Sequence, residues 1–172
     1  GLNETDIEAV FVSNMGAGQN ENQLHLGAMA SQMIKGYPAA MRIEGACASG
    51  GLAVIAAEQS LLSGQYKTVL VVGVEKMNDA DSSLTTKYLS GASDYTSEFG
   101  STFPGLYAIL ANAHIKEYGT TRKQLSAVAK KNHDHGFDNP QAQYHKHFTN
   151  EQISSSTLVA DPLRLLDCSP IT

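Results

Sequence analysis

A cysteine at position 47 lies at the junction between a short apolar segment and a long one, a pattern that predicts a turn from a strand into a helix. A helix N-terminus presents unpaired N–H groups and a positive dipole end, so it favours a thiolate and stabilises a developing oxyanion. The residues around the thiol are small, namely Gly45, Ala46, Ala48, Gly50 and Gly51. Because small residues let a thioester approach closely, the junction favours nucleophilic acyl transfer through Cys47.

The elements that position Cys47 follow from the hydrophobic pattern on either side of it. We expect strands at 7–13, 39–44 and 68–74, the last a continuous apolar run typical of a strand covered on both faces. A helix with apolar residues at helical spacing ends at Gly36. The segment 52–62 is apolar almost all round, which predicts a helix buried in the middle of the molecule. Strand, helix and strand form a parallel βαβ unit, so the predicted fold class is α/β.

The second half of the chain has a different pattern. The polar stretch 79–101 predicts an insertion outside the sheet. Pro104 opens a predicted helix that Gly119 closes, and Thr121 with Gln124 forms a capping box for the next helix. The chain is then polar with little periodicity until residues 158–163, which look extended near a proline. This half is therefore predicted to be a helical subdomain.

Composition excludes several classes of protein. The 172 residues, 42% hydrophobic and 17% charged, fit an ordinary globular domain. A formal net charge of -5 without a basic cluster argues against a nucleic-acid partner. No apolar run approaches the roughly 20 residues of a membrane helix, and the first residues lack the features of a signal peptide. We therefore expect a cytoplasmic protein with reduced cysteines and no membrane or nucleic-acid partner.

Five motifs in order along the chain resemble those of thiolases. They are 46–51 (ACASGG), 72–78 (VGVEKMN), 101–108 (STFPGLYA), 118–121 (YGTT) and 161–170 (DPLRLLDCSP). The subgroup that the chain most resembles is the sterol-carrier-protein-2-type thiolases, including acetyl-CoA acetyltransferases of archaeal and bacterial kind. The resemblance implies a layered thiolase-like fold, in which part of an N-terminal domain has a mixed, mostly parallel sheet with a buried helix and a helical loop-domain insertion.

The resemblance also implies roles for particular segments. Residues 1–78 would be a partial N-terminal domain, 79–163 the loop domain that covers coenzyme A, and 164–172 the return towards the sheet. Cys47 matches the nucleophile that is acylated by acyl-CoA, with its own N–H in the oxyanion hole. Ser169 and Phe99 fall where relatives contact or pack against the pantetheine arm. Coenzyme A and acyl-CoA would be substrates, with no permanently bound cofactor.

Thiolases also need a histidine and a second cysteine, and both belong to a C-terminal domain beyond this sequence. We therefore expect part of the N-terminal half of a longer protein, which by itself turns over no acetoacetyl-CoA. An edge strand at 39–44 is a liability unless it is covered, and thiolases pair this strand with its twofold mate, so we expect a homodimer. Some archaeal thiolases assemble with a hydroxymethylglutaryl-CoA synthase. The resemblance implies the same kind of partner for this chain.

Several other residues that could do chemistry have simpler interpretations. Cys168 precedes Ser169 and a proline, unlike the second catalytic cysteine of thiolases, so we expect a structural thiol. The pairs His133/His135 and His145/His147 suggest a metal site, but no cysteine or carboxylate cluster completes it, and solvated loop histidines are expected. Glu75 and Met77 are interpreted as structural or as part of a subunit contact.

Two alternatives to a thiolase remain open. One alternative is a ketoacyl synthase. The residues after Cys47 argue against it, because the nucleophile of that family is typically followed by serines, whereas residues 48–50 here are ASG. The other alternative is a non-catalytic thiolase-like module that binds acyl-CoA or serves in assembly, against which the presence of Cys47 argues. If the chain is catalytic, the reaction is either acetyl transfer between acetyl-CoA molecules or thiolysis of a 3-ketoacyl-CoA.

Overall fold

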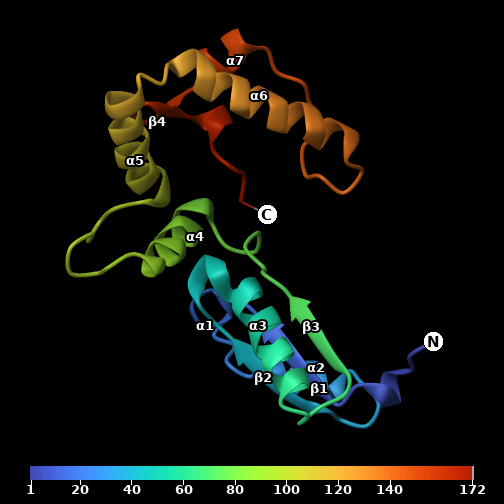
Figure 1. Cartoon of the computed structure of the whole chain (residues 1–172). Coiled ribbons are helices and arrows are strands. Elements are labelled where there is room, and N and C mark those ends of the chain that lie inside the picture. The colour runs from blue at the N-terminus through green and yellow to red at the C-terminus, as the bar shows by residue number, and fades with distance from the viewer. Residues whose placement is uncertain (172) are drawn as a thin grey trace. The chain divides into compact units, whose positions relative to one another are not determined.

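A computed structural model describes residues Gly1–Ile171. The chain divides into two compact units, the first from Gly1 to Ala92 and the second from Ser93 onward. Figure 1 shows a strand-containing first unit and a largely helical second unit, and each is described by itself below. No helix within Gly1–Ile171 combines the length and the apolar composition needed to cross a membrane.

The first unit is built on a parallel sheet of three strands. β1 (Ala9–Ser13) lies between β2 (Ala39–Ile43) and β3 (Val69–Gly73), in the order β2-β1-β3. Phe11 is opposite Met41 on one side and Val71 on the other. The predicted α/β class is confirmed, and β2 lies at an edge of the sheet as expected. Because all three strands run the same way, their carboxyl ends meet at one edge.

Two helices of the first unit pack against this sheet (Figure 1). α2 (Leu26–Gln32) approaches β2 so closely that a side chain at Gly27 would meet the Met41 backbone at 3.0 Å. α3 (Ser49–Leu62) packs against β1 through Ala53 and Ala57, which form the core with Ala9 and Phe11. The remaining elements are α1 (Ala17–Asn20), α4 (Ser82–Leu89) and the short 3-10 turns η1 (Glu4–Asp6), η2 (Ala46–Ala48) and η3 (Ser90–Ala92).

The prediction that α3 is buried all round is wrong for this chain. Only small residues of α3 are buried, whereas Val54 is 57% exposed and Leu62 is 81% exposed. β3 is likewise not covered on both faces, and the fully buried strand is β1. The physical reason is the same in both cases. An apolar pattern shows that a surface can be buried, but burial depends on what packs against it, and outward side chains of α3 and β3 stay exposed, such as Val54 at 57% and Val71 at 37%.

The second unit contains three helices and a small hairpin. α5 spans Phe103–Tyr118, and its first turn is capped by Thr102, whose side chain accepts a hydrogen bond from the Gly105 N–H. α6 spans Arg122–Asp138 and begins with the predicted capping box of Thr121 and Gln124. Gly119 between them has φ +68, the left-handed conformation that glycine adopts without strain.

The end of the second unit folds back onto α6. α7 (Asn150–Ser155) packs against α6 and supplies the fully buried Ile153. β4 (Leu158–Ala160) pairs antiparallel with β5 (Leu163–Arg164), which agrees with the extended segment expected here, and the turn η4 (Leu165–Asp167) follows. α7 was not predicted, although Thr149 and Gln152 form a capping box of the same kind as the one before α6.

Candidate active site

The turn that carries Cys47 is held by the side chains of Glu44 and Ser49, which both bind the backbone of Ala46. Cys47 is exposed and lies in η2, between β2 and the start of α3. The residue before it, Ala46, has φ +50, an uncommon and strained conformation for a residue other than glycine. The Ala46 N–H donates to Glu44 Oε1 at 2.6 Å, and the Ala46 carbonyl accepts from Ser49 Oγ at 2.6 Å. Ser49 Oγ also accepts from the Gly45 N–H at 3.0 Å.

Glycine at position 45 leaves room for a side chain of α3. A Cβ added there would overlap the Cδ1 atom of Leu52, so a larger residue would displace the end of that side chain. This is the structural counterpart of the small residues that surround the thiol in the sequence.

Cys47 opens onto a cavity of about 390 Å³ at the carboxyl ends of the parallel strands. Its volume lies in the range of small-molecule sites, roughly 300–1,000 Å³. The walls come from the ends of β1 and β3, the Cys47 turn, and α1 and α4, and comprise Ser13, Asn14, Met15, Gly16, Asn20, Ala46, Cys47, Ser49, Gly50, Gly73, Val74, Glu75, Met77, Tyr88 and Leu89. The carboxyl edge of an open parallel sheet is where α/β proteins bind their ligands.

A hydrogen-bond network joins the three strand ends beside this cavity. Asn14, just after β1, donates through Nδ2 to the Val74 carbonyl at 2.7 Å and accepts through Oδ1 from the Ala17 N–H at 2.8 Å. Arg42 of β2 donates through Nη2 to the Met15 carbonyl at 2.8 Å and to the Asn14 carbonyl at 3.1 Å. The network therefore holds the β1 end between its two neighbours. Asn14 was not singled out from the sequence, although a short polar residue at the end of a strand is a usable signal.

Glu75 and Met77 follow β3 at the same edge. The Glu75 carboxylate accepts hydrogen bonds from the backbone N–H groups of Met15 and Gly16, at the start of α1. This agrees with the structural interpretation of Glu75, since its carboxylate is occupied by backbone donors. Met77 lines the cavity and accepts a hydrogen bond at its carbonyl from Thr85 Oγ1 at 3.2 Å.

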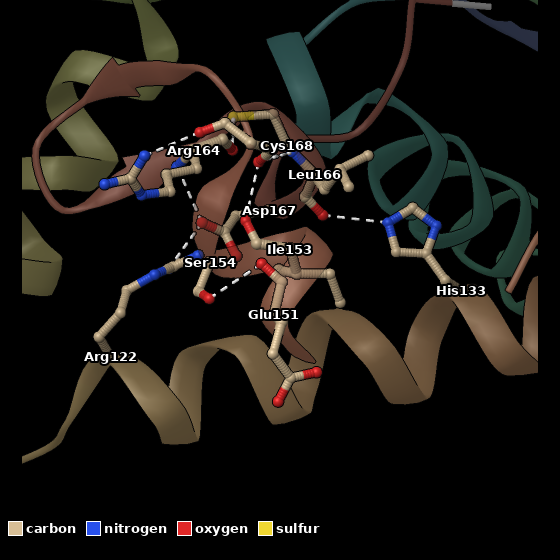
Figure 2. Close-up of polar contacts among 10 residues, drawn as sticks. Arg122, His133, Glu151, Ile153, Ser154, Arg164, Leu166, Asp167 and Cys168 are labelled. Atoms are coloured by element: carbon tan, nitrogen blue, oxygen red, sulfur yellow. Dashed lines mark hydrogen bonds and ion pairs between the residues drawn. The ribbon is translucent and has the colours of Figure 1, made fainter. Parts of the chain in front are cut away.

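The second unit has a cavity of its own, of about 280 Å³, which contains Cys168 and Ser169. Ser169 is exposed at this cavity. Cys168 is half-buried, and its Sγ donates to the Arg164 carbonyl at 3.5 Å (Figure 2). Burial, and then the negative charge of Asp167, raise the pKa of the Cys168 thiol. Both causes disfavour the thiolate, which supports the prediction that this cysteine is structural.

Charged and backbone groups hold the Cys168 segment against α6. Asp167, whose side chain is 7% exposed, lies 2.7 Å from Arg122 Nη1 and accepts the Arg164 N–H at 2.8 Å. His133 of α6 places Nε2 3.0 Å from the Leu166 carbonyl. Figure 2 shows these interactions on successive residues of the segment that leads to Cys168. The segment is therefore anchored from two points along α6.

Phe99 lies apart from both of these cavities. Its side chain is 75% exposed and packs edge-to-face against Tyr95, with ring centroids 5.1 Å apart. The structure therefore places Ser169 at a cavity and Phe99 on the surface of the second unit.

The histidines do not gather into a cluster. Within Gly1–Ile171, no three His, Cys, Asp or Glu side chains come close enough together to hold a metal ion. The expectation of solvated loop residues is wrong for His133, which lies half-buried on α6. His145 Nδ1 lies 3.1 Å from the Phe137 carbonyl, and His147 Nδ1 lies 2.8 Å from Asp134 Oδ1. Hydrogen bonds from Lys130, also on α6, and then from His147 lower the pKa of Asp134. The contacts of His145 and His147 tie the loop after α6 back to the helix.

Comparisons with known proteins agree with this architecture. Residues 1–166 match the family model described as "Thiolase, N-terminal domain". The chain is 42% identical to an acetyl-CoA acetyltransferase of Methanothermobacter thermautotrophicus, covering 100% of this chain and 45% of the relative. A protein of the same name from Methanocaldococcus jannaschii is 41% identical, with 100% and 44% covered. Sterol carrier protein 2 of Gallus gallus is 30% identical over 72% of this chain and 24% of its own length.

Among solved structures, the chain resembles one titled "Ltp2-ChsH2(DUF35) aldolase". The TM-score is 0.66 at 21% identity, and the match covers 98% of this chain and 43% of the other. At this identity the likeness shows the fold alone. The chain spans less than half the length of each of these relatives.

Proposed function

This chain belongs to the thiolase family, and on that premise we propose that it supplies the nucleophile of an acyltransferase acting on acyl-CoA. The Cys47 thiolate attacks the thioester carbonyl and forms a new sulfur–carbon bond. The bond from the acyl carbon to the coenzyme A sulfur then breaks, and the released coenzyme A thiolate takes up a proton. In condensation the carbanion of a second acetyl-CoA then attacks the acyl carbon, and the bond from that carbon to the Cys47 sulfur breaks. In thiolysis the thiolate instead attacks the 3-keto carbonyl of a 3-ketoacyl-CoA, the C2–C3 bond breaks, and the carbanion released takes up a proton to give acetyl-CoA. The acyl group then passes from Cys47 to the sulfur of coenzyme A.

One observation carries this proposal: an exposed thiol opens onto a cavity at the carboxyl edge of the sheet, directly before a helix of 14 residues. The positive end of the α3 dipole and the N–H groups of its first turn favour negative charge at this position. The Cys47 N–H would form part of the oxyanion hole for the tetrahedral intermediate. The acetyl-CoA acetyltransferase relatives support acyl transfer as the chemistry.

Replacement of each cysteine tests this proposal. In the complete protein, we expect Cys47→Ala to lower acetyl transfer by roughly four orders of magnitude or more, because loss of a nucleophile removes the covalent route. Cys168→Ala is the matched control and should remain active. The measurement is the rate of acetoacetyl-CoA cleavage. A Cys47→Ala variant with wild-type turnover would contradict the proposal, and a protein that binds acyl-CoA without turnover would be the non-catalytic module instead.

The chain beyond residue 78 supplies the proposed binding surface for coenzyme A. Residues 79–163 would act as the loop domain that covers coenzyme A, with 1–78 as the partial catalytic domain and 164–172 as the return towards the sheet. Ser169 would contact the pantetheine arm, and its place at a cavity supports this role. Phe99 would pack against the same arm, for which its exposed ring is suited. We propose coenzyme A and acyl-CoA as substrates, with no permanently bound cofactor.

Cys47 would not complete the reaction alone. In thiolases a histidine activates the nucleophile and a second cysteine moves the proton, and the relatives are more than twice as long as this chain. We propose that both residues belong to the part of those relatives that this chain does not match. The 172-residue chain by itself should then show no thiolysis of acetoacetyl-CoA, and a normal rate from it would overturn this point.

We also propose a homodimer formed along β2. β2 lies at the edge of the sheet, and the Ala39 N–H donates to the Glu8 carbonyl, so the next N–H, that of Ala40, points away from β1. Ala40→Pro should therefore disrupt the dimer while leaving the β1 side of the strand paired. Arg42 is a poorer choice because its side chain also binds the turn after β1. Light scattering that still shows a dimer for Ala40→Pro would exclude this strand as the contact.

We also propose a compartment and a protein partner. A reduced Cys47 fits a cytoplasmic protein, since an oxidised thiol could not accept an acyl group. A complex with a hydroxymethylglutaryl-CoA synthase follows from the resemblance to archaeal thiolases alone. Co-purification of that enzyme with the complete protein would support the complex, and its absence at matched expression would count against it.

A further inference from the structure

Ser49 uses its one hydroxyl proton within the turn and cannot donate it to a substrate, which sets it apart from the thiol of Cys47. Its side chain is 5% exposed, and its hydroxyl donates to the Ala46 carbonyl while accepting from the Gly45 N–H. The two bonds lie on either side of the strained Ala46. Glu44 binds the Ala46 N–H from outside the turn, so side chains hold both polar groups of this residue.

Loss of the Ser49 hydroxyl would leave two backbone groups of the turn without this partner. A residue with φ +50 keeps that conformation only when its surroundings enforce it. Relaxation of Ala46 would rotate the peptide group that leads into Cys47, and would move the sulfur and the N–H of Cys47 together. Displacement of a reacting group by about 1 Å can lower a rate roughly 100-fold.

We infer that Ser49 is a positioning residue, which holds Ala46 in its left-handed conformation and thereby directs the Cys47 sulfur and N–H into the cavity, with Glu44 as its counterpart on the other side of the turn. The inference rests on the proposed role of Cys47 as the acyl acceptor. Ser49 itself is given no part in bond making, because its only hydroxyl proton is donated within the turn.

The test compares Ser49→Ala with Ser60→Ala in the complete protein. Ser60 lies on the same helix, and its hydroxyl donates to the Ala56 carbonyl at 2.8 Å, away from the cavity. We expect Ser49→Ala to slow single-turnover acylation of Cys47 by acetyl-CoA about 10- to 100-fold relative to Ser60→Ala. Alkylation of Cys47 by iodoacetamide should stay near the wild-type rate, because this small reagent needs only an exposed thiolate.

Glu44 provides a second pair of variants that does not alter α3. Glu44→Gln keeps an oxygen that can accept the Ala46 N–H and should preserve acylation, whereas Glu44→Leu removes the acceptor and should slow it. A structural effect alone would lower acylation, alkylation and the thermal unfolding midpoint together. That parallel loss, or acylation of Ser49→Ala at the Ser60→Ala rate, would overturn the inference. If wild-type Cys47 is never acylated, the proposed function fails first and the role of Ser49 fails with it.

Discussion

Cys47 and Cys168 carry the same functional group in opposite surroundings. Cys47 is exposed in a turn made of backbone and small residues, at a cavity where parallel strands end. Cys168 is half-buried beside the carboxylate of Asp167, and its thiol donates to a backbone carbonyl. The difference shows that reactivity here depends on position in the fold, since the residue type is the same. A thiolate needs solvent, N–H groups or positive charge, and only the first cysteine has a helix N-terminus beside it.

The two cavities are also built by different means. Hydrogen bonds from Asn14 and Arg42 to backbone carbonyls join the strand ends around the first cavity. The second is bordered by a segment held through an ion pair between Arg122 and Asp167. The anchoring carboxylate of the second unit thus stands beside the thiol, and burial first and then its charge raise the pKa of Cys168.

Alkylation rates should separate the two thiols most clearly. At pH 8 we expect iodoacetamide to modify Cys47 faster than Cys168, because Cys47 is exposed whereas burial and the charge of Asp167 raise the pKa of Cys168 and lower its thiolate fraction. Since the pKa of Cys168 is raised by burial and by Asp167, its rate should still be climbing above pH 9, its ordinary value. The measurement is peptide mass spectrometry over a pH series. Faster modification of Cys168 than of Cys47 at pH 8 would contradict the comparison.

A smaller effect should follow from removing the charge next to Cys168. Asp167→Asn eliminates the second cause of the raised pKa but leaves burial, the larger cause, in place. We expect the pKa of Cys168 to fall and its alkylation rate at pH 8 to rise, by less than the difference in rate between Cys168 and Cys47.

Asp138→Asn, at the exposed end of α6, is the control for the loss of one carboxylate. Because Asp167 also pairs with Arg122, the thermal unfolding midpoint must be measured alongside the rate. An unchanged or slower rate for Cys168 in a folded Asp167→Asn variant would show that the charge does not suppress the thiol.

Local signals in the sequence predicted much of this fold. The strands and the capping box at Thr121 were predicted because alternating or continuous apolar runs and N-terminal caps act within a few residues. The position of Cys47 before α3 was predicted for the same reason. The cap of α7 at Thr149 carried an equal signal, but the polar segment around it has no apolar periodicity.

Tertiary features were beyond local prediction. The exposure of Val54 and Leu62 depends on what packs against α3, which an apolar pattern does not specify. The contacts of Arg42 with the turn after β1 exist only because two strands far apart in the sequence end at the same edge. The hydrogen bond from Ser49 to the Ala46 carbonyl accompanies a positive φ angle at Ala46, which the sequence does not reveal.

The most direct test of this account is the location of the acyl group. The complete protein is mixed with acetyl-CoA, quenched in acid before the second step, digested, and mapped by tandem mass spectrometry. The account predicts one acetyl group per chain on the peptide that contains Cys47, with stoichiometric release of coenzyme A and an unmodified Cys168. Acetylation of Cys168 with Cys47 left free, or release of coenzyme A without an acyl-protein, would contradict it.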